Sequence, residues 1–260
     1  MLYVSKKLKS RLVLNIAIFI AVFFCSLSYA AQNETVLLYG RNVSGNWYPY
    51  YIPENPQAPG IFAELIPLIM LRADIAVNPI EMPPRRNAQA IKEGLIDLDI
   101  VSPDWFENGQ LADIYVASKP ILTIIEYLVT LPENQTSFMF LDNIYGPYQH
   151  VGTVAGYYYF DDKKFTRADF PSESTLVLGL KKERFDVAIL EEMTARYWAH
   201  QHKISITFGA IHSEGRIVIR LLKKHQYLIP HINNAINEMK QEGAIEKIIN
   251  KYKENITYNN

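Results

Sequence analysis

Apolar runs alternate with polar or glycine- and proline-rich stretches along the chain, and their periods predict strands and helices in turn. Residues 36–39 form a short apolar run that predicts a first buried strand. Residues 61–72 are apolar enough for a helix, in which Pro67 either belongs to the first turn of a late-starting helix or kinks an early-starting one. Residues 75–80 predict a second strand, short or at a sheet edge because it contains Pro79.

The next stretch predicts a helix, a strand and a loop in close succession. Pro83 and Pro84 suit the start of a helix, and Gly94 suits its end. Residues 96–101 then alternate between aliphatic side chains and aspartates, which predicts a strand that ends at Ser102. Because ligands of open α/β sheets bind outside the carboxyl ends of the strands, Ser102 is a candidate ligand-facing residue.

The second half of the chain continues this alternation. A long extended run at 121–130 predicts a strand that crosses between two lobes, and residues 204–208 predict the return crossing. The other predicted elements are strands at 151–156, 185–190 and 216–221, and helices at 174–182, 191–200, 232–239 and 245–252. Strands that alternate with helices in this way predict the α/β class.

The first 30 residues have the parts of a secretory signal peptide. Four basic residues precede an apolar core at 16–27, and small residues before Ala31 suit cleavage. The apolar run is shorter than the roughly 20 residues of a spanning helix, which favours a cleaved signal over a membrane anchor. The single cysteine, Cys25, lies in this segment. We therefore expect a periplasmic mature protein without thiols or disulfides.

Charge and composition narrow the class of partner. Removal of residues 1–30 leaves 22 basic and 27 acidic residues, a net charge of −5. Such a chain is a poor partner for nucleic acid and offers no polybasic patch to anionic lipid. With 49% hydrophobic residues, the chain can bury substantial cores and form one large domain or two small ones.

Two aromatic clusters are candidate ligand walls. The first comprises Trp47, Tyr48, Tyr50 and Tyr51, too many aromatic rings for a solvated loop. These rings either pack over the core or stack on a ligand, and the sequence favours neither. The second cluster, residues 157–160, follows a predicted strand and a glycine turn.

Motifs spread over residues 36–252 occur in a distinctive order. They are Tyr48-Pro49-Tyr50 with GIFAEL at 60–65, GLID at 94–97, VGTVAG at 151–156 with FDVAILE at 185–191, and a paired-helix segment from Asn234 through Gly243 to Tyr252. In this order and spacing they resemble the periplasmic solute-binding proteins of extracellular family 3, which serve ABC importers of polar amino acids.

The resemblance implies a two-lobed periplasmic binding protein type II fold, α/β in class, with lobes joined by two crossing strands. Residues 31–122 and 210–260 would form lobe 1 and residues 123–209 lobe 2, after a signal peptide at 1–30. A monomer would capture a small polar or amino-acid-like solute by hinge closure and deliver it to an ABC-transporter permease. The resemblance implies no cofactor, no metal and no catalysis.

The resemblance also assigns roles to individual residues. Ser102 would offer a hydroxyl or backbone group to the ligand, and Glu191 would pair with its ammonium. Trp47 or Tyr50 would be the stacking aromatic. Tyr157 and Tyr158 would occupy the glycine turn that receives a carboxylate. Without a ligand, Glu191 is explained equally well as a carboxylate at a helix N-terminus.

One residue of the family pattern is missing. The family's carboxylate-binding arginine should follow Ser102 in a T-x-x-R loop, but residues 103–109 read PDWFENG. Its loss removes the main charge-assisted contact to an α-carboxylate. Either Arg85 or Arg86 replaces it, or Trp105 adapts the site to an apolar, aromatic or cationic ligand. The alternatives are two solvated arginines and a tryptophan that packs beside the hinge.

Two rival functions share this fold. A sensory input protein would present the bound solute to a membrane kinase or cyclase, and its sequence would look the same. An enzyme similar to cyclohexadienyl dehydratases would use Glu191 as a general acid. The chain shows no nucleophile elbow and no histidine paired with a carboxylate in a known motif, which favours binding over catalysis.

Overall fold

The structure, a computed structural model, describes residues 36–42 and 47–257. The predicted signal peptide at 1–30, with Cys25, lies outside these residues. Within the described ranges, no helix has the length and apolar character needed to cross a membrane.

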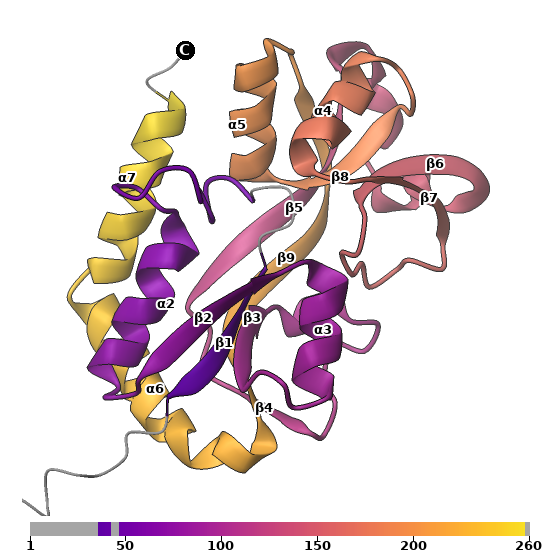
Figure 1. Cartoon of the computed structure of the whole chain (residues 1–260). Coiled ribbons are helices and arrows are strands. Elements are labelled where there is room, and N and C mark those ends of the chain that lie inside the picture. Colours follow the sequence, from indigo (N-terminus) through magenta and orange to yellow (C-terminus); the bar gives the residue numbers. More distant parts are fainter. Residues whose placement is uncertain (1–35, 43–46, 258–260) are drawn as a thin grey trace, which may run out of the picture. The chain divides into compact units, whose positions relative to one another are not determined.

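Strands and helices alternate along the described chain, so the predicted α/β class is confirmed (Figure 1). The strands are β1 (Leu37–Asn42), β2 (Val77–Met82), β3 (Leu98–Val101), β4 (Tyr115–Ala117), β5 (Leu122–Thr130), β6 (Gly146–Val154), β7 (Phe165–Phe170), β8 (Val187–Glu191) and β9 (Thr207–Leu222). The helices are α2 (Ile61–Arg72), α3 (Pro84–Lys92), α4 (Glu173–Lys181), α5 (Glu192–His202), α6 (Ile229–Gln241) and α7 (Ala244–Thr257), with 3-10 turns η1 (Pro103–Trp105), η2 (Pro132–Phe138), η3 (Leu141–Ile144) and η4 (Lys223–Leu228).

Two groups of parallel strands are joined by two long strands. The strand order is β2-β1-β3-β9-β5-β8-β6-β7, and β4 also pairs with β9. Strand β1 is parallel to β2 and β3, and β6 is parallel to β7 and β8. Between these groups, β9 is antiparallel to β3 and β5, and β5 is antiparallel to β8. We call the part around β1–β4 with α2, α3, α6 and α7 lobe 1, and the part around β6–β8 with α4 and α5 lobe 2.

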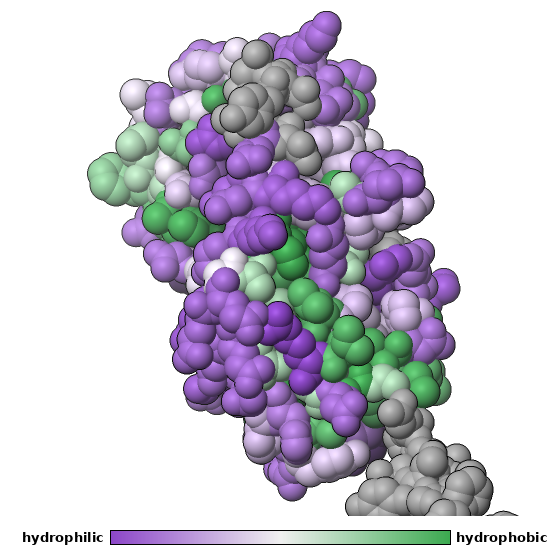
Figure 2. Space-filling model, turned by 90° about the vertical axis from the view of Figure 1, so that its left-hand side faces the viewer, coloured by the Kyte–Doolittle hydropathy of each residue, from purple (hydrophilic) through white to green (hydrophobic). Residues whose placement is uncertain are grey.

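Each lobe buries its own apolar cluster. In lobe 1, α2 packs against α6 and α7, and its buried face includes Phe62, Leu65 and Ile69. In lobe 2, α4 buries Leu176 and Leu180 beside β8. Full burial of one such side chain contributes about 1.5–3 kcal/mol. The outer side of α7 consists mainly of exposed charged and polar residues, and the face that carries this helix is largely hydrophilic in Figure 2.

The structure settles one open prediction, corrects another and adds a strand that the sequence did not predict. Helix α2 begins at Ile61, so Pro67 lies inside it. Residues 204–208 and 216–221 were predicted as two strands, but β9 is one strand of sixteen residues. Its polar and glycine-containing middle breaks the apolar pattern while β9 stays paired to β5 through register shifts. Strand β7 was missed because its six residues, FTRADF, contain little alternation.

Candidate functional site

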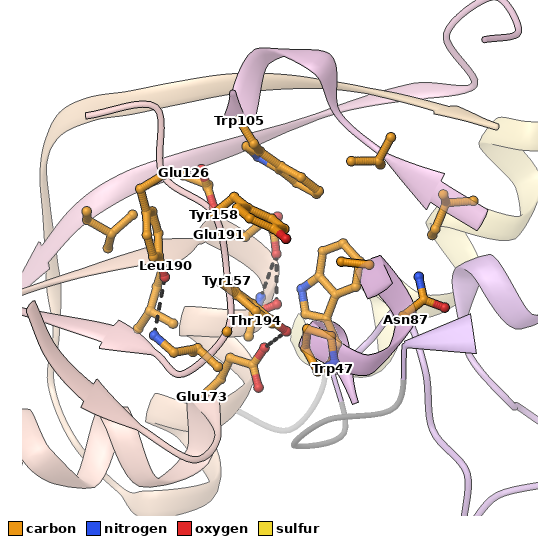
Figure 3. Close-up of a pocket in the computed structure, with 18 of the residues that line it drawn as sticks. Trp47, Asn87, Trp105, Glu126, Tyr157, Tyr158, Glu173, Leu190, Glu191 and Thr194 are labelled. Atoms are coloured by element: carbon orange, nitrogen blue, oxygen red, sulfur yellow. Dashed lines mark hydrogen bonds between the residues drawn. The ribbon is translucent and has the colours of Figure 1, made fainter. Parts of the chain in front are cut away.

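A cavity lies between segments of the two lobes and has a volume of about 900 Å³ including its opening to solvent (Figure 3). From lobe 1, its lining includes the aromatic loop before α2, helix α3, strand β3 and turn η1. From lobe 2, it includes the turn after β6, the first residue of α4, strand β8 and the start of α5. The crossing strands β5 and β9 contribute Glu126 and Arg220.

The structure brings five of the nine predicted site residues to this cavity. They are Trp47, Trp105, Tyr157, Tyr158 and Glu191. They come from both lobes and are distant in sequence, so the fold places two aromatic clusters and a carboxylate around one space. Their contact with a ligand stays a prediction.

Two other predicted residues, Tyr50 and Ser102, are buried outside the cavity lining. The Tyr50 ring stacks on Phe62 with centroids 4.9 Å apart, and its hydroxyl donates to Met193 Sδ at 3.8 Å. The Ser102 hydroxyl accepts from the Asp104 N–H and donates to the Asp104 carboxylate, both at 3.2 Å. Because these local bonds occupy it, the Ser102 hydroxyl caps η1 and does not face the cavity.

The structure also leaves Arg85 and Arg86 outside the cavity lining. Both lie exposed in the first turn of α3. The Arg85 stem lies against Gly156, where an added Cβ would be 3.1 Å from Arg85 Cγ. Gly156 has φ +88°, a left-handed conformation that suits glycine. Arg85 therefore lies against the turn after β6, beside the cavity, and replacement of the missing cleft arginine by Arg85 or Arg86 stays a prediction.

A buried ion pair, Asp99 with Arg220, lines the cavity and was missed by the sequence analysis. Arg220 Nε and Nη2 donate to the Asp99 carboxylate at 2.9 and 2.7 Å. Asn87 Nδ2 donates to the same carboxylate at 2.8 Å. Asn87 fits there because Gly40 has no Cβ, which would lie 2.1 Å from Asn87 Oδ1. The only sequence signal was an aspartate within an aliphatic strand.

The first aromatic cluster packs in the core of lobe 1, and part of it also lines the cavity, whereas stacking on a ligand stays a prediction. Trp47, Tyr50 and Tyr51 belong to the core of lobe 1, and Trp47 and Tyr51 also line the cavity. Trp47 lies 4.6 Å from Tyr50 and 6.4 Å from Trp105 between ring centroids. Together with Phe62 at 5.4 Å, these neighbouring rings hold the Trp47 ring at the cavity wall.

Glu191 is both a helix cap and a cavity residue. It is 7% exposed, its carboxylate accepts the Met193 and Thr194 N–H groups at 3.0 and 2.9 Å, and its Oε2 lies 3.0 Å from the Thr194 hydroxyl oxygen. Burial raises the pKa of Glu191 to about 7, although these bonds and the Tyr50 hydroxyl counteract it. The carboxyl therefore changes its charge near neutral pH.

Glu173 is a second buried carboxyl group in the cavity. It is 2% exposed, and its Oε1 accepts the Tyr157 hydroxyl at 2.5 Å (Figure 3). Its Oε2 has no hydrogen-bond partner among the other described residues. Burial raises the pKa of Glu173 to about 7, and the charge of Glu191 adds to this effect. The sequence showed only an acidic residue in the first turn of a helix.

Glu126 belongs to a buried network on the crossing strands. Its Oε2 accepts the Ser213 hydroxyl at 2.5 Å and lies 3.6 Å from His212 Nδ1. The other ring nitrogen of His212, Nε2, lies 3.0 Å from Asp161 Oδ1. Burial lowers the pKa of His212, but the bonds and charges of Asp161 and Glu126 outweigh it and raise the pKa to about 9. At neutral pH a buried imidazolium thus lies between two carboxylates.

Contacts between the lobes flank the cavity. Phe106 of lobe 1 and Tyr158 of lobe 2 have ring centroids 5.4 Å apart, and Lys163 Nζ lies 2.7 Å from Glu107 Oε2. Near α5, the Thr194 hydroxyl donates to the Tyr48 carbonyl at 2.7 Å. Tyr48 also stacks on Tyr197, with centroids 4.6 Å apart. Among the described residues, no group of three His, Cys, Asp or Glu side chains could hold a metal ion.

Comparison with solved structures places this geometry in a known architecture. The arginine-binding protein of T. maritima, solved as a mutant, matches with 19% identity and a TM-score of 0.68 over 84% of this chain and 94% of its own. An amino-acid ABC-transporter substrate-binding protein from Streptococcus pneumoniae, bound to L-arginine, matches with 16% identity and a TM-score of 0.66 over 86% and 97%. A histidine kinase sensor domain similar to periplasmic binding proteins matches with 15% identity and a TM-score of 0.68 over 84% and 96%.

These likenesses concern the fold. No family model matches the sequence, and no curated protein matches it. The structural matches cover most of both chains and confirm the predicted two-lobed periplasmic binding protein fold.

Proposed function

We propose that this protein captures a small polar or amino-acid-like solute between its lobes in the periplasm and delivers it to an ABC importer. The observation that carries the proposal is the cavity itself, which is lined by side chains from both lobes and flanked by contacts between them. A solute in this space would join the lobes and favour the closed arrangement. Two of the solved structures of this fold are named as arginine- or amino-acid-binding proteins, which supports an amino-acid-like solute.

The proposal includes the lobe boundaries and the site. Residues 31–122 and 210–260 would form lobe 1 and residues 123–209 lobe 2. The separate apolar clusters and the two crossing strands support this division. Glu191, the aromatic residues and the buried carboxylates would contact the solute, and the absence of a cleft arginine after Ser102 would make the site atypical. We propose binding without catalysis, and recovery of the solute unchanged after incubation would test that part.

Thermal unfolding of residues 31–260 against a panel of amino acids, amines, small peptides and aromatic acids tests the function. A ligand at 100 times its dissociation constant adds about 2.7 kcal/mol of stability. A selective increase in melting temperature is expected for one chemical class. If no compound changes the melting temperature, solute capture is not the function of this cavity.

A sensory role is the second candidate, because one structure of the same fold is a histidine kinase sensor domain. The importer and the sensor differ in what responds to the bound solute. Deletion of the gene should abolish uptake of the radiolabelled solute if the protein serves an importer. Normal uptake together with a lost transcriptional response would favour the sensor.

A further inference from the structure

The charges around the cavity are unbalanced. Four lining residues carry carboxyl groups, Asp99, Glu126, Glu173 and Glu191, whereas Arg220 is the one lysine or arginine among the described lining residues. All five are at most 8% exposed. Buried carboxylates are stabilised by cations or hydrogen-bond donors, so the cavity favours a ligand that supplies both.

Arg220 is already neutralised. Its guanidinium makes two parallel bonds to Asp99 and lies over the Tyr115 ring, 4.7 Å from the ring centroid. A guanidinium engaged in this way has its planar fork occupied and its charge balanced. The described lining residues therefore offer no free guanidinium to a ligand carboxylate. Since Glu126 already lies beside His212, a carboxylate would instead meet Glu173 and Glu191.

The Glu173 carboxylate can accept a hydrogen bond from a ligand. Its side chain is almost completely buried, one oxygen accepts from Tyr157, and the other has no hydrogen-bond partner among the other described residues. An N–H group of a ligand would satisfy this oxygen and form a charge-assisted bond. Trp47, Trp105 and Tyr158 supply aromatic surface around the same space, and aromatic faces attract cations.

We propose that the cavity selects an organic cation that carries N–H donors and no carboxylate, and that Glu173 accepts one of these donors. The inference rests on the proposed solute-binding function and specifies its ligand class. Primary amines and guanidines without a carboxylate are the compounds that have this chemistry. Free amino acids differ from them by the α-carboxylate that the cavity disfavours.

Calorimetric titration of three matched pairs tests the inference on the native chain. The pairs are arginine and agmatine, lysine and cadaverine, and tyrosine and tyramine, whose members differ only in the carboxylate. We expect at least one decarboxylated compound to bind about tenfold or more tightly than its amino acid. Tighter binding of the amino acid in the pairs that bind would overturn the inference and leave solute capture intact. Absence of binding in every pair would overturn the inference, and the broader panel would then decide on solute capture.

Two variants test the residues. Glu173→Gln should weaken binding of the preferred amine at least tenfold, whereas Glu183→Gln, an exposed change in the same lobe, should leave it unchanged. Asp99→Asn removes the charge that neutralises Arg220, so the preference should shift toward the amino acid of each pair. The proposed arrangement would be contradicted if Asp99→Asn left the preference between amine and amino acid unchanged. It would also be contradicted if Glu173→Gln had a normal melting temperature and an unchanged affinity for the amine.

Discussion

At the scale of single residues, buried ionisable groups dominate this site. His212 lies between Asp161 and Glu126, and the imidazole is 1% exposed. Removal of one member of a buried charged network leaves the others without compensation, which commonly costs about 3–5 kcal/mol. The network therefore holds together the crossing strands β5 and β9 and the loop after β6.

We predict that His212→Gln lowers the free energy of unfolding at pH 7 by about 3 kcal/mol. Urea unfolding measures this change in the free energy of unfolding, and His231→Gln, a substitution at an exposed position, is the control. The pKa of His212 is about 9 in the folded protein against 6.5 normally, so its stabilising effect is complete below about pH 6.5 and disappears as the pH rises through about 9. A difference of less than about 0.5 kcal/mol at pH 7, the usual range for surface substitutions, would contradict this role.

Glu173 and Glu191 predict a second pH dependence. Each has a folded pKa of about 7 against an ordinary value of 4.5, so the protein without ligand should lose stability as the pH rises from about 4.5 to about 7. Titratable groups beside them are Tyr157 for Glu173 and Tyr50 for Glu191. Glu191→Gln should flatten this slope in melting temperatures recorded from pH 4.5 to 8, whereas Glu192→Gln, a change at the half-buried neighbouring position, should not.

Cation binding should have the opposite pH dependence. The carboxylates must be ionised to hold a cation, so affinity for an amine should rise as the pH increases through about 7, and binding should release protons there. Titrations in buffers of different ionisation enthalpy measure this release. Affinity that is constant between pH 5.5 and 8 would exclude both glutamates as contacts of the ligand charge. Glu191→Gln should also weaken amine binding while it leaves the fold intact.

Cavity residues that stand at the end of a predicted element could be located from the sequence. Cavity residues that are held by a partner far away in the sequence could not. Trp105 and Glu191 stand at a strand end and at a helix start, where ligand-facing side chains are expected. Asp99 and Arg220 are separated by 121 positions, and no local pattern joins them. Ser102 failed to reach the cavity because Asp104, two residues later, occupies its hydroxyl.

At the scale of elements, helices were predicted more accurately than strands. The apolar periods of α4, α6 and α7 placed these helices within a few residues of their observed bounds. Strand β9 was read as two strands because Gly209, Ser213 and Gly215 interrupt its apolar pattern. Its pairing with β5 and the packing around its glycines keep it extended, and these tertiary contacts are absent from the sequence pattern.

Gly209 of β9 tests this explanation. An added Cβ would lie 2.2 Å from the Phe138 carbonyl oxygen, and a backbone atom cannot move aside as a side chain can. Gly209→Ala should therefore lower the free energy of unfolding by about 1–3 kcal/mol. Gly215→Ala is the comparison, because its Cβ would meet the movable Trp105 side chain at 3.1 Å. We expect Gly215→Ala to cost less stability and to change ligand affinity through Trp105. Equal stability losses in chemical unfolding would contradict this order.

At the scale of the whole molecule, the two lobes meet at more than one place. Tyr48 stacks on Tyr197 near α5, and Lys163 pairs with Glu107 at a second contact. The Lys163–Glu107 pair is exposed, so it contributes little energy by itself. The pair is nevertheless a sensitive reporter of lobe closure, because the two residues belong to different lobes and separate if the lobes open.

The double variant E107C/K163C should therefore report lobe closure. The mature chain is expected to lack other thiols, so a short bismaleimide can join only these positions within one molecule. A ligand that bridges the lobes shifts the population toward the closed arrangement, and the cross-linked fraction should rise with concentration of the compound that gives the largest melting shift. The pair E192C/R196C, one turn apart on α5, should cross-link equally with and without that compound. If E107C/K163C also cross-links equally with and without the compound, the solute binds without moving the lobes, and the hinge-closure prediction is wrong.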